Sequence, residues 1–239
     1  MYSVGRLSMK NGSTTEKTMI YVLLGMTVVT GLVDAVSFLS LGRVFTANMT
    51  GNVVILAFAT ARVFGLSIAR SSTALLSFFV GAILGGRIMA RASAEAQIQF
   101  AAQAFLVEIA LLLAASFCAI GYNRGHLPED SFQAFALIAL MALAMGTRNA
   151  AVRKLAIPDL TTTVLTLPVT GIAADSSIAN GTNPRLARRL GSVAAMFLGA
   201  ALGAVIIRYS ISAALMLGAA ISVLCSAVLF RSMRTTGQL

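Results

Sequence analysis

Residues Gly31–Asn52, GLVDAVSFLSLGRVFTANMTGN, lie in the first hydrophobic region of the chain and determine how the rest is interpreted. This stretch carries a carboxylate, an arginine, two asparagines, three glycines and several hydroxyls. A segment built only to cross a bilayer would avoid most of these groups. Polar, glycine-interrupted backbone at membrane depth is tolerated only where it is buried in protein or lines a cavity. We therefore interpret the stretch as half of a binding site.

The overall composition is that of an integral membrane protein. Of the 239 residues, 58% are hydrophobic and only 11% are charged, and the mean hydropathy is +0.87. Soluble domains carry about 25% charged residues. The net charge of +10 comes from Lys and Arg that lie mainly between apolar runs, without tryptophan or an aromatic-interleaved basic stripe. Cytoplasmic positive charge explains this balance better than a nucleic-acid partner does.

Six apolar runs are long enough to span a hydrocarbon core, which needs about 20 helical residues. They cover residues 19–41, 72–92, 101–122, 132–152, 190–208 and 209–230. Two further stretches, Phe45–Ala61 and Leu160–Ile178, are rich in hydroxyls and broken by Gly, and the second also by Pro168. They are typical of re-entrant or discontinuous helices. The predicted fold is all-α: a polytopic transmembrane bundle with six spans, two broken or re-entrant segments and two pseudo-symmetric halves.

The distribution of Lys and Arg favours six spans with both termini cytoplasmic, because this arrangement obeys the positive-inside rule better than the alternative of eight full spans. The expected organisation begins with a cytoplasmic tail at 1–18 and a first transmembrane repeat at 19–122. A connecting loop at 123–131, a second repeat at 132–230 and a cytoplasmic tail at 231–239 follow.

Three matches, in the same order and at a nearly constant offset, indicate that the halves are repeats. Residues 79–85, FVGAILG, match 197–203, FLGAALG; Thr50 and Gly51 match Thr170 and Gly171; Gly31 and Asp34 match Gly146 and Asn149. With three spans per half, the repeats would be inverted in the membrane, as in many secondary transporters. With four spans per half they would be parallel.

Residues 31–54, GLVDAVSFLSLGRVFTANMTGNVV, residues 145–175 and the intervening FVGAILGG resemble the YoaK-like family of bacterial membrane proteins. The resemblance covers nearly the whole chain, and the MTGN and PDLTTTVLT elements carry most of it. It implies a multi-pass protein of the bacterial cytoplasmic (inner) membrane with six transmembrane segments. It implies no substrate, because the family is catalogued as a domain of unknown function.

Two carboxylates fall inside predicted spans, where an ionisable group costs a few kcal/mol and needs a partner or water. Asp34 would couple transport to a proton or cation, or bind the substrate; the structural alternative is that it caps a broken helix or pairs with an arginine. Glu108, which lacks polar sequence neighbours, would relay a proton or serve as a neutral hydrogen-bonding acid. Arg148, beside Asn149, could neutralise Asp34, bind an anion or extend to the interface.

The two broken segments supply the remaining candidates. A helix starting after Asn48 would direct free backbone N–H groups into the protein, where they could hold an anionic solute; alternatively, the hydroxyls there satisfy backbone groups freed by Gly and Pro. The predicted binding or coupling residues are Asp34, Glu108, Arg148 and Asn149 of the spans, and from these segments Asn48, Thr50, Gly51, Asn52, Thr162, Thr163, Thr166 and Thr170. We expect the two segments to face one another across a shared pocket. Helix packing is predicted for the GxxxG pairs Gly81/Gly85 and Gly199/Gly203.

The leading functional hypothesis is a secondary transporter of a small polar or anionic metabolite, with proton coupling through Asp34, alone or with Glu108, as one form of it. The alternative is a non-transporting membrane protein: a channel, a lipid-interacting scaffold or a regulatory subunit. No nucleotide-binding P-loop, HExxH or GxSxG occurs, so we expect no enzyme, catalytic residue, metal or cofactor. The expected partners are the lipid bilayer and a small-molecule solute, and a homo-oligomer is compatible with the sequence.

Overall fold

The computed structural model describes residues 12–93, 96–122 and 131–235, and within these ranges the fold is entirely helical. The helices are α1 (Gly12–Ser40), α2 (Met49–Thr60), α3 (Ile68–Ala90), α4 (Gln97–Cys118), α5 (Phe132–Leu155), α6 (Thr166–Ala174), α7 (Leu186–Ile206) and α8 (Ile211–Thr235), with a 3₁₀ turn at Ser177–Ala179. α1 begins at Gly12 and α8 ends at Thr235, so both helices continue into the predicted tails.

Six of the described helices are long and apolar enough to cross a membrane, which confirms the predicted bundle of six spans. The two remaining α-helices are too short to cross. α2 has 12 residues and α6 has 9, lengths of about 18 and 14 Å at 1.5 Å per residue. Each is therefore about half of a hydrocarbon core of roughly 30 Å.

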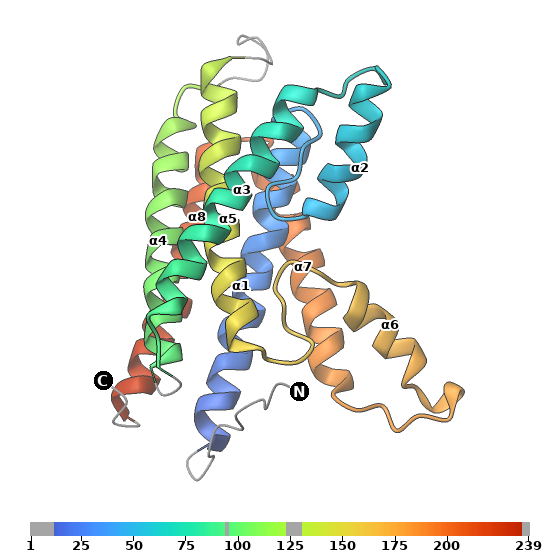
Figure 1. Ribbon diagram of the computed structural model, residues 1–239, viewed down its shortest axis with the longest axis vertical. Coiled ribbons are helices and arrows are strands. Elements are labelled where there is room, and N and C mark those ends of the chain that lie inside the picture. Colours follow the sequence, from blue (N-terminus) through green and yellow to red (C-terminus); the bar gives the residue numbers. More distant parts are fainter. Residues whose placement is uncertain (1–11, 94–95, 123–130, 236–239) are drawn as a thin grey trace.

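Both short helices are re-entrant (Figure 1). After α1, the chain turns back to the middle of the bundle, and α2 then returns to the end that the chain had just left. α6 follows α5 in the same way at the opposite end. α1 begins and α8 ends at the same end of the bundle (Figure 1). The chain thus crosses the bundle six times and dips into it twice.

Glycines allow the closest helix contacts. α1 packs on α7 and α8, and α5 packs on α3 and α4, while α2 lies on α3 and α6 on α7. A Cβ atom at Gly81 or Gly85 of α3 would lie 2.2 Å from a carbonyl oxygen of α5. In α7, a Cβ atom would lie 2.0 Å from the Val28 oxygen at Gly199 and 2.9 Å from the Leu32 oxygen at Gly203. The two GxxxG pairs therefore lie in separate seams, α3 against α5 and α7 against α1.

Candidate functional site

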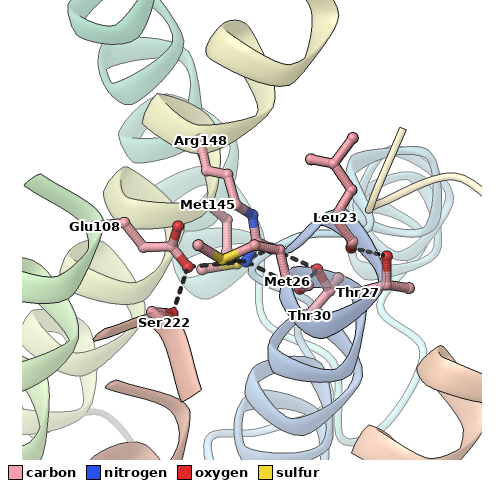
Figure 2. A network of polar contacts seen from close by, with 8 residues as sticks. All are labelled: Leu23, Met26, Thr27, Thr30, Glu108, Met145, Arg148 and Ser222. Carbon is pink, nitrogen blue, oxygen red and sulfur yellow. Dashed lines mark hydrogen bonds and ion pairs between the residues drawn. The ribbon is translucent and has the colours of Figure 1, made fainter. Parts of the chain in front are cut away.

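A fully buried ion pair joins α4 and α5 where four helices meet (Figure 2). Arg148 Nη1 lies 2.8 Å from Glu108 Oε1, and both side chains have no exposed surface. Arg148 also donates to the Met26 carbonyl at 3.1 Å and to Thr30 Oγ1, both on α1. The hydroxyl of Ser222 on α8 donates to Glu108 Oε1 at 3.4 Å. Arg148 and Glu108 thus connect α1, α4, α5 and α8.

The pair keeps unused hydrogen-bonding capacity. Glu108 Oε2 and Arg148 Nε are buried and have no hydrogen-bond partner, although buried polar groups are paired in the great majority of structures. The thioether sulfurs of Met26 and Met145 lie beside the guanidinium, 4.0 and 3.0 Å from its nitrogens. In such apolar surroundings each charge requires the other, because a single buried charge without a counter-ion is strongly destabilising.

Asp34 is held by the backbone of the segment that follows α1. Its Oδ1 accepts from the backbone N–H groups of Thr46 at 3.0 Å and Ala47 at 2.8 Å. The ion pair of Arg148 is formed with Glu108, not with Asp34. Asp34 thereby holds the turn that brings the chain back into the bundle, while the N-cap of α2 itself is Asn48.

The Asn48–Asn52 turn is filled by its own hydrogen bonds. Asn48 caps α2 by accepting from the Gly51 N–H at 3.2 Å. The buried Asn52 amide accepts from the Phe45 N–H at 2.9 Å and donates to the Phe45 carbonyl. A Cβ atom at Gly51 would lie 2.9 Å from the Phe45 ring, and Thr50 is exposed. The polar groups of this turn serve its backbone, with Thr50 free to meet lipid or solute.

Asn52→Ala should loosen this turn, because the Phe45 N–H and carbonyl would lose both partners inside the protein. Leaving a buried polar group unpaired costs about 1–3 kcal/mol. We expect faster amide hydrogen exchange in residues 41–52 and unchanged exchange in α4. Thr50→Ala, which removes an exposed hydroxyl from the same turn, is the matched control. Equal exchange in Asn52→Ala and in the unmodified protein would contradict this role.

The second interruption is more open than the first. Asn149 Oδ1 accepts from Thr163 Oγ1 at 3.0 Å, and Thr162 has a positive φ of 60° with a buried hydroxyl that lacks a partner. Thr166 and Thr170 are exposed on α6, whose N-terminus has no side-chain cap. The segment therefore satisfies fewer of its polar groups than the Asn48–Asn52 turn does.

A cavity of about 260 Å³ lies in this second segment. Its lining residues are Asn149, Val152, Arg153, Ala156, Ile157, Leu160, Thr161, Thr163 and Val164. All come from α5 and the chain that follows it, so the two interruptions do not share this cavity. The physical reason is that Asp34, Asn48 and Asn52 use their polar atoms to close the first turn, which leaves that turn little free hydrogen-bonding capacity to offer a common pocket.

Arg189 of α7 was not anticipated from the sequence, although it lies among several basic residues. It is 5% exposed and donates to the Gly171 carbonyl of α6 at 2.6 Å. It also pairs with Asp175 at 2.7 Å and with Asp159 at 3.4 Å. A basic cluster at a membrane interface usually signals orientation; only the tertiary structure shows that this arginine fastens α6 and the preceding segment to α7.

Across residues 12–93, 96–122 and 131–235, no group of three or more His, Cys, Asp or Glu side chains is close enough to hold a metal ion. Both cysteines, Cys118 and Cys225, are free thiols. The polar groups of the candidate site thus belong to the ion pair, the two re-entrant segments and the cavity.

These features define a multi-pass α-helical membrane protein with a buried ion pair between its spans. Residues 22–228 match the family described as "Protein of unknown function (DUF1275)", and the chain belongs to this family. It is 33% identical over 147 residues to the UPF0700 transmembrane protein YoaK of Bacillus subtilis (strain 168), a match that covers 62% of this chain and 62% of that protein. Comparison with solved structures finds no match.

Proposed function

We propose that the protein is a secondary transporter of a small polar or anionic solute in the bacterial inner membrane, and not an enzyme. The observation that carries this proposal is the ion pair of Arg148 and Glu108, both without exposed surface, among the spans. Charged side chains inside a bilayer are expensive and typically mark solute or proton pathways. A purely structural bundle could be built more stably from apolar residues, because a buried ion pair contributes little net stability.

The re-entrant helices give further support. Secondary transporters often place solutes where discontinuous helices from two inverted halves end inside the membrane. α2 and α6 are such half-length helices and enter from opposite ends (Figure 1). The glycine seams are consistent with an inverted repeat, since Gly31 of α1 lies against α7 while its sequence counterpart Gly146 of α5 lies against α3. We infer two pseudo-symmetric halves on this basis.

The charge distribution supports cytoplasmic termini. Lys17 at the start of α1 and Arg231 and Arg234 at the end of α8 lie at one end of the bundle. The same end holds the basic residues near the adjoining ends of α3, α5 and α7: Arg87, Arg91, Arg153, Lys154, Arg185, Arg188 and Arg189. Among the described residues, the opposite end has fewer: Arg43, Arg62, Arg70 and Arg208. The positive-inside rule therefore assigns the first end to the cytoplasm.

Transport can be tested with purified protein in liposomes and a panel of radiolabelled solutes: lactate, succinate, inorganic phosphate and a neutral amino acid. We expect uptake of at least one anion above that of protein-free liposomes. Arg148→Lys should lower that uptake at least tenfold, because an ammonium group cannot contact Glu108 and Thr30 in the geometry of a guanidinium. Gly86→Ala is the matched control, since a Cβ atom there meets nothing within 4 Å.

One observation favours the alternative of a non-transporting membrane protein. The cavity lining does not include Arg148, and the Arg148 side chain is fully enclosed by the four helices around it. A scaffold or regulatory subunit would keep this packing permanently. The liposome assay separates the two possibilities: no uptake of any probe, with the protein folded and correctly inserted, would contradict transport and support the alternative.

A further inference from the structure

The cavity stops one helical turn short of the buried arginine. Val152, which lines the cavity, follows Arg148 by four residues on α5, so the two residues lie on the same helical face with their Cα atoms about 6 Å apart along the axis. Asn149, the neighbour of Arg148, also lines the cavity. Residues that line the cavity and the buried arginine therefore belong to the same stretch of α5.

Apolar side chains close this distance. Val152 and Leu160 both line the cavity and are only 2% and 1% exposed. These two side chains form the floor of the cavity. They belong to an apolar cluster that also contains Met26, whose carbonyl accepts from Arg148. This cluster thus extends from the cavity lining to a residue that contacts the guanidinium. Displacing the two floor side chains breaks no side-chain hydrogen bond of their own, because valine and leucine are apolar.

We propose that Arg148 binds the carboxylate of a small monoanion that enters through the floor, and that Glu108 takes up one proton as Arg148 changes partner. This inference rests on the transport function proposed above. The proposed ligand is a short monocarboxylate. The cavity measures about 260 Å³ and combines apolar walls with Asn149, Thr163 and the single charged lining residue Arg153. Within that lining no carboxylate opposes an anion.

The charges balance in this exchange. Before binding, the Arg148 cation faces the Glu108 anion at 2.8 Å. An entering carboxylate would replace Glu108 as the counter-ion and leave the Glu108 charge unpaired, which is strongly unfavourable in an apolar interior. One proton placed on Glu108 Oε2, the oxygen that has no hydrogen-bond partner, removes that charge. Anion and proton then cross together, no covalent bond other than O–H changes, and the net transported charge is zero.

The surroundings of Glu108 suit this proton transfer. Arg148 faces it from α5, and Ser222 and the Cys225 thiol face it from α8. From α1, the Met26 carbonyl and thioether and the Thr30 hydroxyl contact Arg148, and none of these carries a charge. Asp34, also on α1, interacts with Arg148 electrostatically. Glu108 is therefore the carboxylate paired with Arg148. Asp34 is committed to two backbone N–H groups.

The experiment uses the full chain in liposomes that contain a pH-sensitive dye, with radiolabelled lactate and glycolate as probes. Protein-free liposomes give the passive background. We expect one proton to enter per anion, and the initial rate to be unchanged when a potassium gradient with valinomycin sets the membrane potential. Glu108→Gln should lose proton uptake. A lactate-induced rise in the thermal midpoint of the detergent-solubilised protein, at constant ionic strength, gives a readout of binding independent of flux.

Floor variants test the route. Val152→Ala should raise the initial rate of lactate uptake severalfold, and Val152→Phe should lower it at least tenfold. The thermal midpoints of the two lactate-free variants should not follow the order of their uptake rates. Gly86→Ala again serves as the control. Equal rates for both Val152 variants would overturn entry through the floor.

Three results would overturn the coupled exchange. Anion uptake without proton entry, or uptake that follows the membrane potential, would contradict proton coupling through Glu108 but would not contradict the transport function. Loss of proton entry in Asp34→Asn but not in Glu108→Gln would assign coupling to Asp34. Absence of both uptake and a thermal shift with every probe of the wider panel would contradict the transport function itself, and the inference with it.

Discussion

Arg148→Met is expected to destabilise the folded protein by about 3–5 kcal/mol, because it leaves the Glu108 carboxylate buried without its counter-ion. Glu108 has no exposed surface, and its remaining hydrogen bond comes from Ser222 at 3.4 Å. The methionine itself should fit, since the guanidinium already lies against the sulfurs of Met26 and Met145. The measurement is the midpoint of thermal unfolding in detergent, together with the yield of monodisperse protein.

The double variant Arg148→Met/Glu108→Met separates stability from function. With both charges replaced by apolar side chains of similar length, no unpaired charge remains, and replacing both members of a buried pair is often neutral or stabilising. We expect the double variant to recover most of the lost stability and to remain inactive in the liposome assay. A double variant as unstable as Arg148→Met alone would show that the cost arises from packing and not from the unpaired carboxylate.

Gly85→Ala is expected to have the second largest effect. A Cβ atom there would lie 2.2 Å from the Thr147 carbonyl oxygen of α5, so α3 and α5 would have to separate. Overpacking of this kind typically costs about 1–3 kcal/mol. Since Thr147 immediately precedes Arg148, the separation should also displace the guanidinium and lower uptake. Thermal unfolding and liposome uptake measure the two effects.

Gly86→Ala, the adjacent residue of the same helix, is the control for this prediction. No atom lies within 4 Å of a Cβ at Gly86, and alanine favours a helix by about 1 kcal/mol over glycine. We expect unchanged or slightly higher stability and normal uptake. A similar loss in both variants would mean that α3 tolerates no change in flexibility here, and would contradict a specific role for the seam.

Much of the fold follows from local sequence properties. The six spans are predictable because each needs a run of apolar residues matched to the bilayer thickness, a requirement that acts on each segment separately. The two short helices are predictable because Gly, Pro and clustered hydroxyls interrupt their segments. The boundaries are less predictable: α1 begins at Gly12 and α8 extends to Thr235, since a helix can continue beyond the hydrocarbon core that sets the length of the apolar run.

The candidate site shows where prediction from sequence ends. Asp34, Glu108 and Arg148 are recognisable as polar residues in apolar runs, but their partners depend on which helices become neighbours. Arg148 could have met either carboxylate. It meets Glu108 because α4 packs directly on α5, whereas Asp34 is taken up by the turn that follows its own helix.

Local sequence properties are therefore sufficient to identify a membrane protein, its spans and its two interruptions, because transfer of each segment into lipid is an additive property of its residues. The tertiary structure decided which charges pair, which hydroxyls merely close a turn, and where a cavity forms. Those outcomes depend on contacts between segments far apart in the chain: Glu108 and Arg148 are 40 residues apart, and no local pattern encodes their 2.8 Å separation.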